Sequence, residues 1–223
     1  MAPKIYLIRH AESSHNVSKD FSHRDPPLTA NGTAQAAQLV SAFPNPGSIA
    51  VILSSPLTRA IQTTLAAFPH VLDRRYYPGK SGAGVDGGVE LVLDPDLQER
   101  SALPCDTGSK VAILKEEFPG LEVGELGEEW LVKEGEYSAE DRAVEDRARR
   151  ARQRLGRLVE GLDRNNNADV VVVVTHGVFM KFLSQDQDID LPKAGWRAYT
   201  IVQVGSGEWR LIAADDSESE NAL

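Results

Sequence analysis

The sequence predicts a doubly wound α/β fold, in which a mostly parallel sheet is the middle of three layers and helices cover both of its faces. Three observations support this prediction. Short aliphatic runs recur along the chain, segments with helical spacing separate them, and 223 residues suit one sizeable domain. We therefore expect a single domain over residues 1–214, with residues 80–137 inserted beside the substrate pocket. The acidic tail 215–223 is expected to be disordered.

Four aliphatic runs are typical of parallel strands that are buried on both faces. They are Ile5–Ile8, Ile49–Leu53, Val89–Leu93 and Val170–Val174. Near the C-terminus, the turn residues Gly205-Ser206-Gly207 separate Thr200–Val204 from Trp209–Ile212, which predicts a hairpin.

Helical patterns lie between these runs. Thr29 is a good N-cap for a helix that extends to about Phe43, with Ala34, Ala37 and Val40 about one turn apart. A second helix is expected after Pro56, running through Ile61 and Leu65. A third begins with the capping signal Ser138-x-x-Asp141. Its apolar stripe is Val144, Ala148, Ala151, Leu155, Leu158 and Leu162.

The charge balance restricts the possible partners. The chain has 24 Lys and Arg against 33 Asp and Glu, for a net charge of -9 and a pI near 5.1. An acidic chain argues against binding to nucleic acid or to a membrane surface, because both require a cationic face. The acids are concentrated, however, with twelve of them in residues 116–146. We interpret the arginines that follow as a solvated helix face paired with nearby acids. They are Arg147, Arg149, Arg150, Arg152, Arg154 and Arg157.

The sequence also predicts a cytoplasmic location. A single cysteine, Cys105, cannot form an internal disulfide. The first apolar run has four residues, which is too short for the core of a signal peptide. The longest aliphatic run, Val170–Val174, is far shorter than the roughly 20 residues that cross a bilayer.

Polar residues follow three of the predicted strands. Arg9-His10 follows the first, Ser54-Ser55-Pro56 follows the second and leads to Arg59, and Thr175-His176-Gly177 follows Val170–Val174. In an open α/β sheet, ligands bind beyond the carboxyl ends of the strands. Cations gathered there need an anion to neutralise them, and guanidinium groups match the oxygens of a phosphate. The sequence therefore predicts a phosphate site at this edge.

These residues also carry a resemblance to the histidine phosphatase superfamily, the phosphoglycerate-mutase-like proteins. Arg9-His10-Ala11 with Asn16 resembles the family signature R-H-G-x-x-x-x-N, although Ala11 stands where glycine is commonest. The remaining blocks occur in family order from residue 5 to about 185. They are Asp25-Pro26-Pro27-Leu28-Thr29, Ser54-Ser55-Pro56-Leu57-Thr58-Arg59-Ala60-Ile61-Gln62-Thr63, Leu97-Gln98-Glu99 and Thr175-His176-Gly177, in which Thr175 replaces the usual serine.

The resemblance implies a role for each matching residue. His10 would attack phosphorus, and Arg9, Arg59 and His176 would hold the phosphoryl oxygens with help from Asn16. Glu99 would protonate the leaving oxygen and then activate water. This fits the chemistry, because a neutral imidazole is a nucleophile near pH 7 and phosphoryl transfer needs mainly positioning and cationic stabilisation.

The assignment of the acid leaves alternatives open. Glu90, Asp94 and Asp96 lie near the same strand end as Glu99, and the Leu-x-Glu context favours Glu99. Glu12 is a further alternative that could equally cap or orient the first helix.

Other polar residues have less specific signals. His15 and His23 lie in a polar loop, Ser13 to Arg24, that could line the mouth of the pocket, and both are expected to be solvated rather than catalytic. Cys105 is expected to be structural or to lie at the rim. A metal site built on His10 and His176 has no third ligand at useful spacing, so we expect no metal and no cofactor.

Three functions compete at this stage: a phosphomonoesterase, a phosphoglycerate-type phosphomutase, and an idle phosphate-binding or scaffold protein on the same fold. Family mutases carry an aromatic residue before the Asn of the first block, where this chain has His15, and the complete set of site residues argues against the scaffold. We therefore expect hydrolysis of a small phosphorylated substrate. The substrate's identity and a homodimer both stay open.

Overall fold

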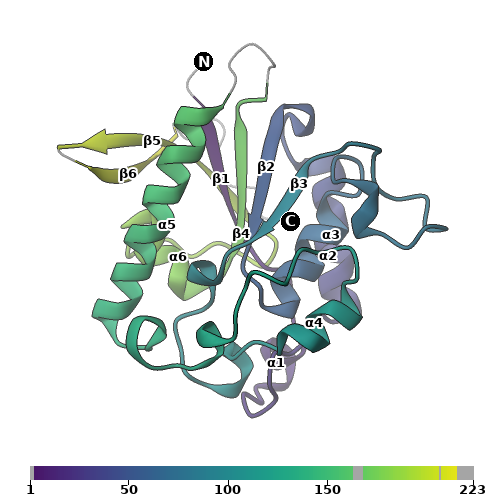
Figure 1. Cartoon of the computed structure of the whole chain (residues 1–223), viewed down its shortest axis with the longest axis horizontal. Helices are drawn as coiled ribbons and strands as arrows, with labels where there is room; N and C mark the ends of the chain where they lie inside the picture. The colour runs from purple at the N-terminus through teal and green to yellow at the C-terminus, as the bar shows by residue number, and fades with distance from the viewer. Residues whose placement is uncertain (1–2, 163–167, 206, 215–223) are drawn as a thin grey trace.

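The computed structural model describes residues 3–162, 168–205 and 207–214, and it confirms the predicted fold class. One six-stranded sheet has the order β3-β2-β4-β1-β5-β6, with helices on both faces (Figure 1). Neighbouring strands from β3 to β1 are parallel, whereas β5 and β6 are antiparallel. The strands are β1 (Lys4–Arg9), β2 (Ile49–Ser54), β3 (Glu90–Leu93), β4 (Val170–Thr175), β5 (Trp196–Val204) and β6 (Glu208–Ala213). The predicted tail 215–223 lies outside the described residues.

The helices form the two outer layers. They are α1 (Ser14–Ser18), α2 (Ala30–Ala42), α3 (Thr58–Ala67), α4 (Val111–Glu117), α5 (Asp141–Gly161) and α6 (Gly177–Ser184). Successive side chains of a strand point to opposite faces, so β1 feeds two cores. Tyr6 and Ile8 pack on the side of α2 and α3, while Ile5 and Leu7 pack on the side of α5 and α6. This two-sided burial explains the continuous aliphatic runs.

The predicted C-terminal hairpin is present, but its first strand is longer than the prediction. Strand β5 begins at Trp196 rather than Thr200, because Trp196–Tyr199 pair with β1 in antiparallel register. Arg197 and Ala198 interrupt the β-branched pattern there and hid this half of the strand from the sequence.

The apolar face predicted for α2 is wrong. Ala34, Ala37 and Val40 are exposed, and the buried side of the helix consists of Gly32, Ala36 and Leu39. Gly32 explains the rotation, since a Cβ there would lie 1.9 Å from the backbone oxygen of Glu12. The helix therefore packs through its smallest residue. Its N-cap is Thr29, as predicted, and the Thr29 hydroxyl accepts the N–H of Gly32.

The starts of α3 and α5 differ from the prediction by a few residues. Helix α3 begins at Thr58, two residues beyond Pro56. Helix α5 has Glu140 as its N-cap, and the Ser138 hydroxyl instead accepts the N–H of Glu140 at 3.2 Å. The apolar stripe of α5 is confirmed by the burial of Val144, Ala148, Ala151 and Leu155.

The interpretation of the α5 arginines as a solvated face is wrong for two of them. Arg147 and Arg152 are 1% and 2% exposed, because their guanidinium groups donate to backbone carbonyls of neighbouring segments. In the described part of the chain, none of the helices combines the length and the apolar composition that crossing a bilayer requires.

Candidate active site

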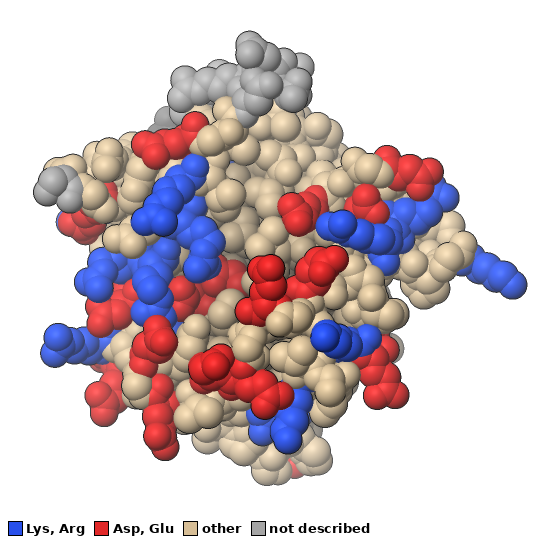
Figure 2. All heavy atoms as spheres, in the orientation of Figure 1, with Lys and Arg blue, Asp and Glu red and all other residues tan. Residues whose placement is uncertain are grey.

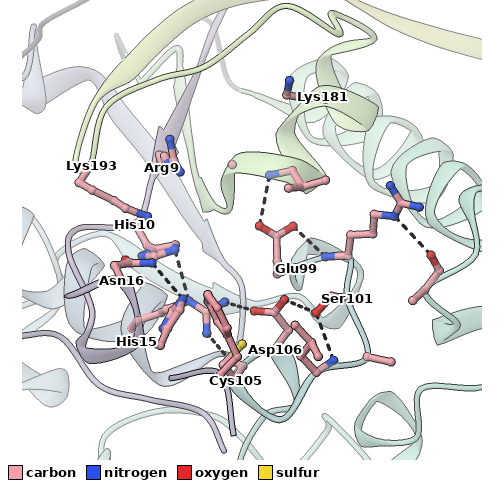
Figure 3. Close-up of a pocket in the computed structure, with 18 of the residues that line it drawn as sticks. Arg9, His10, His15, Asn16, Glu99, Ser101, Cys105, Asp106, Lys181 and Lys193 are labelled. Atoms are coloured by element: carbon pink, nitrogen blue, oxygen red, sulfur yellow. Dashed lines mark hydrogen bonds and ion pairs between the residues drawn. The ribbon is translucent and has the colours of Figure 1, made fainter. Parts of the chain in front are cut away.

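The three polar strand ends meet at one edge of the sheet. Strands β1, β4 and β2 are neighbours in the sheet. His10, His176 and Ser55, respectively, are the first residues after their carboxyl ends. Beside them lies a cavity of about 580 Å³. Its lining residues include Arg9, His10, His15, Asn16, Arg59, Glu99, Arg100, Asp106, Lys181, Asp190 and Lys193. In Figure 3, Arg9, His10 and Lys193 lie on one side of the pocket and Glu99 lies across from them.

His10 is held in the form that a nucleophile needs. Its Nδ1 lies 2.7 Å from the carbonyl oxygen of Ala11. A carbonyl can only accept, so we assign the ring proton to Nδ1, which leaves the lone pair on Nε2. Burial lowers the pKa of the His10 imidazole well below its usual range, and the charge of Arg59 lowers it further. His10 is therefore neutral at pH 7.

Arg59 is the cation nearest to this lone pair. Its Nε donates to His10 Nε2 at 3.3 Å, and its side chain is 1% exposed. Nη1 donates to the carbonyl oxygen of Cys105 at 2.7 Å, and Nη2 donates to Asp106 Oδ1 at 2.8 Å. Ser101 holds the other oxygen of Asp106 at 2.6 Å. These contacts fix the guanidinium beside His10.

Arg9 depends on a neighbouring glycine. Its Nη1 donates to Asp190 at 3.0 Å and to the carbonyl oxygen of Leu191. A Cβ on Gly177 would lie 2.9 Å from Arg9 Cζ, so the guanidinium lies directly against the start of α6. The glycine of the Thr175-His176-Gly177 block thus makes room for the arginine of the first block.

His176 presents one free ring nitrogen inside the site. Its Nε2 lies 2.8 Å from the Ser55 hydroxyl, which itself accepts the N–H of Leu57 at 3.3 Å. The Ser55 hydroxyl is still able to donate its own proton to Nε2, and in that arrangement the ring proton of His176 is on Nδ1. That Nδ1 is buried and has no hydrogen-bond partner among the described residues. The His176 ring lies 5.0 Å, between centroids, from the His10 ring, and with its proton on Nδ1 it would donate to an oxygen of a ligand bound there.

Of the five acids considered for proton transfer, Glu99 is the one that lines the cavity. Its Oε1 accepts the N–H groups of Arg100 and Phe179 at 2.8 and 2.9 Å, and its Oε2 accepts that of Val178 at 3.2 Å. The carboxylate thereby lies at the positive end of α6.

The alternative acids have other partners. Asp94 is paired with Arg154 and Asp96 with Arg150, both from α5. Glu90 lies 3.8 Å from Arg75. Glu12 accepts the Thr29 hydroxyl at 2.6 Å, so it contacts the residue that caps α2.

The expectation that His15 is solvated is wrong, while His23 is exposed as expected. His15 is 7% exposed and lines the cavity, with its two ring nitrogens 3.0 Å from Ser13 Oγ and from Asn16 Nδ2. Burial lowers the pKa of His15 to about 4. Asn16 lines the cavity as well, and its contact with His15 joins the two side chains in a short network. Cys105 is buried, and burial raises the pKa of its thiol to about 11.

Two further site residues were not found from the sequence. Asp106 binds Arg59, and Lys193 lines the cavity from the loop before β5. Burial, together with the positive charges of Arg9 and Arg59, lowers the pKa of the Lys193 ammonium to about 7. Because β5 runs antiparallel to β1, the residues just before Trp196 necessarily lie at the edge that carries His10. That pairing was the missing signal.

The pocket is more cationic than the chain as a whole. Five Lys or Arg side chains line the cavity against three acids, although the net charge is -9. Many acids lie instead on the outer surface, where Figure 2 shows them in the middle of the view and around the basic side chains of α5. Among the described residues, no group of three or more His, Cys, Asp or Glu is placed to hold a metal ion.

Fold and pocket together define a class: a doubly wound α/β protein with a histidine-centred cationic site at the carboxyl edge of its sheet. Residues 5–76 and 80–217 match the model of the histidine phosphatase superfamily, branch 1. The chain therefore belongs to the histidine phosphatase superfamily.

Relatives and solved structures agree with this. The chain is 30% identical over 201 residues to a probable phosphatase of Schizosaccharomyces pombe, covering 85% of this chain and 83% of the relative. It is similar in fold to Bacillus stearothermophilus YhfR, with a TM-score of 0.58, 19% identity and coverage of 98% of each chain. A mycobacterial glucosyl-3-phosphoglycerate phosphatase in complex with VO3 gives a TM-score of 0.55 at 21% identity, over 95% of this chain and 98% of that one. Family and relatives support a phosphatase activity.

Proposed function

We propose that this chain is a metal-independent phosphomonoesterase that hydrolyses a small phosphate ester through a phosphohistidine on His10. The observation that carries the proposal is the fixed tautomer of His10, with Nδ1 bound to a carbonyl oxygen and Nε2 directed to the Arg59 guanidinium in the cavity. A neutral imidazole beside a buried cation is suited to attack a bound phosphoryl group.

The first half of the reaction forms the intermediate. The lone pair of His10 Nε2 attacks phosphorus while the bond from phosphorus to the ester oxygen breaks, and Glu99, in its protonated form, gives its proton to that oxygen. Arg9, Arg59 and the Nδ1–H of His176 bind the phosphoryl oxygens, with Asn16 assisting, and so stabilise their charge without a metal.

The second half releases phosphate. The Glu99 carboxylate takes a proton from water, whose oxygen attacks phosphorus, and the bond from phosphorus to His10 breaks. His10 regains its lone pair and Glu99 regains its proton, so the cycle closes.

The test is turnover of an aryl phosphate in the presence of EDTA, with mass spectrometry of an acid-labile phosphate on His10. We expect EDTA-resistant hydrolysis, and no turnover or adduct in His10→Ala. A strict metal requirement, or full activity of His10→Ala, would overturn the mechanism. Phosphoryl transfer to 3-phosphoglycerate after priming with its bisphosphate would establish the mutase instead, and inactivity on a broad ester panel would overturn the phosphatase and favour the scaffold.

A further inference from the structure

The mouth of the pocket has an apolar wall, which we define as Phe21, Ala102, Leu103 and Val178. All four line the cavity. Phe21, Leu103 and Val178 are 43%, 48% and 41% exposed, so each shows a large part of its side chain to solvent. Single exposed apolar residues are ordinary, but several around one cavity mark a place where an apolar group binds.

Hydrogen bonds of their backbone groups hold Phe21 and Leu103 of this wall in place. The N–H of Cys105 donates to the carbonyl oxygen of Phe21 at 3.2 Å, and the N–H of Leu103 donates to Ser101 Oγ at 3.1 Å. The Cys105 carbonyl in turn accepts from Arg59. The wall is therefore continuous with the groups that would hold the phosphoryl group.

The cations on the outer side of the pocket already have partners. Arg100 forms an ion pair with Asp141 at 2.6 Å, and Lys181 donates to the carbonyl oxygen of Gln187 at 2.8 Å. Lys193 lies with Arg9 and His10, on the phosphoryl side of the view in Figure 3. Arg100 and Lys181 are thus engaged within the protein, and beyond the phosphoryl group the apolar wall favours an apolar leaving group.

We propose that the substrate is a phosphate monoester whose alcohol carries an alkyl or aryl group that packs on the apolar wall. This inference rests on the proposed phosphatase function and names the class of its leaving group.

The test is a series of n-alkyl phosphates from ethyl to hexyl, in which the acidity of the alcohol stays nearly constant while the apolar length grows. We expect kcat/KM to rise by roughly two- to fourfold per methylene until the wall is covered. Phe21→Ser and Leu103→Ser should flatten this rise. Ile113→Ser is the matched control, because Ile113 is 50% exposed on α4 and does not line the cavity.

The outcomes separate the two proposals. A flat chain-length profile in an active enzyme, or a higher kcat/KM for 3-phosphoglycerate than for hexyl phosphate, overturns the leaving-group class and leaves the phosphatase standing. Inactivity on every ester overturns the phosphatase itself.

A second, independent observation concerns the segment that carries Glu99. Three arginines one helical turn or two apart on α5, which we call the arginine stripe, contact this segment: Arg147, Arg150 and Arg154. Arg147 Nη1 donates to the carbonyl oxygens of Asp96 and Gln98 at 2.8 and 3.0 Å. Arg150 and Arg154 pair with the carboxylates of Asp96 and Asp94.

Arg147 also contacts the other support of Glu99. Its guanidinium carbon lies 4.8 Å from the centre of the Phe179 ring, and the N–H of Phe179 donates to Glu99 Oε1. At the end of β4, the Thr175 hydroxyl donates to the carbonyl oxygen of Leu97 at 2.8 Å. The backbone before Glu99 and one of the N–H groups that bind its carboxylate are therefore held by Arg147, Thr175 and Phe179, none of which lines the cavity.

The geometry points to Arg147 as a positioning residue that sets the place of the Glu99 carboxyl relative to the leaving oxygen. This inference also rests on the proposed function. A misplaced acid should affect esters that need proton donation and spare those that do not.

The test compares kcat/KM for phenyl phosphate, a poor leaving group, with 2,4-dinitrophenyl phosphate, a good one. In Arg147→Met we expect a loss of about tenfold or more on the first and less than about twofold on the second. Glu99→Gln should show the same selective pattern, and Arg147→Lys should restore part of the loss. A variant that is merely unstable loses both activities equally, so an equal loss, or none, overturns the positioning role. If Glu99→Gln is not selective, Glu99 as proton donor fails instead.

Discussion

Arg59 and Arg147 are equally buried, each 1% exposed, yet they differ in what their guanidinium groups face. Arg147 faces backbone carbonyls and the Phe179 ring, so its donors serve the protein itself. Arg59 faces Asp106 and a carbonyl on one side and the lone pair of His10 on the other. Burial alone therefore does not distinguish a binding cation from a structural one. The distinguishing feature is a hydrogen-bond donor that lies in the cavity, where an oxygen of a bound ligand can take the place of the present acceptor.

The strongest challenge to this comparison is the loss of Arg59. Removing a preorganised donor from a site of developing charge costs about a hundred- to a thousandfold in rate. We therefore expect Arg59→Met, combined with Asp106→Asn to avoid an unpaired buried carboxylate, to lose that much kcat/KM on 2,4-dinitrophenyl phosphate. Asp106→Asn alone is the control for the second change. Arg147→Met on the same ester should change less than about twofold, and a similar loss in both variants would erase the distinction.

The acid stability of the fold gives the next largest effect. Burial lowers the pKa of His15 to about 4, and it lowers the pKa of His10 and His176 well below the usual value of 6.5. Between these values the unfolded chain binds more protons than the folded one, so stability rises with pH and is lost as pH falls from 6.5 toward 4. His15 alone contributes at most about 3 kcal/mol over that window.

His15→Gln keeps a polar side chain that does not titrate in this range. We expect the free energy of unfolding of this variant, measured with urea, to depend on pH less steeply than that of wild type between pH 6.5 and 4. The difference in slope corresponds to the uptake of up to one proton on unfolding. Gln38→Ala is the control, because Gln38 is an exposed residue of α2 that does not titrate, so the slope should stay unchanged. Equal slopes for wild type and His15→Gln would show that His15 is not held neutral by the fold.

The sequence could predict the parallel strands and the residues at their carboxyl ends, because aliphatic runs and strand-end chemistry are local signals. It could not place side chains that reach the site through tertiary contacts. Lys193 lies at the edge that carries His10 because β5 pairs with β1, and Arg147 is buried because a loop about fifty residues earlier offers it carbonyl oxygens. The face of α2 was likewise decided by the close approach of Gly32 to Glu12. Each of these depends on how elements pack, which no local pattern contains.

Gly177 tests how finely Arg9 must be placed. A Cβ at this position would lie within 3.0 Å of three guanidinium atoms of Arg9 and would displace them, while the backbone of α6 needs no special angle there. Because the obstacle is the end of a flexible side chain, we expect Gly177→Ala to fold with little loss of stability and to lose about tenfold in kcat/KM. Gly161→Ala, with open space around its Cβ, is the control. A large drop in melting temperature without a kinetic effect would contradict the placement.

The smallest effect is expected from an exposed arginine of the same helix. Arg149 pairs with Asp146 at 2.9 Å, but its side chain is 55% exposed and water screens the pair. Arg149→Ala should therefore change the free energy of unfolding by no more than about 0.5 kcal/mol, and it should leave the ratio of phenyl to 2,4-dinitrophenyl phosphate turnover unchanged. Arg147 lies only two residues away, on the side that faces the Glu99 segment. A selective loss in Arg149→Ala would mean that the charge of α5 as a whole, rather than the contacts of Arg147, acts on the site.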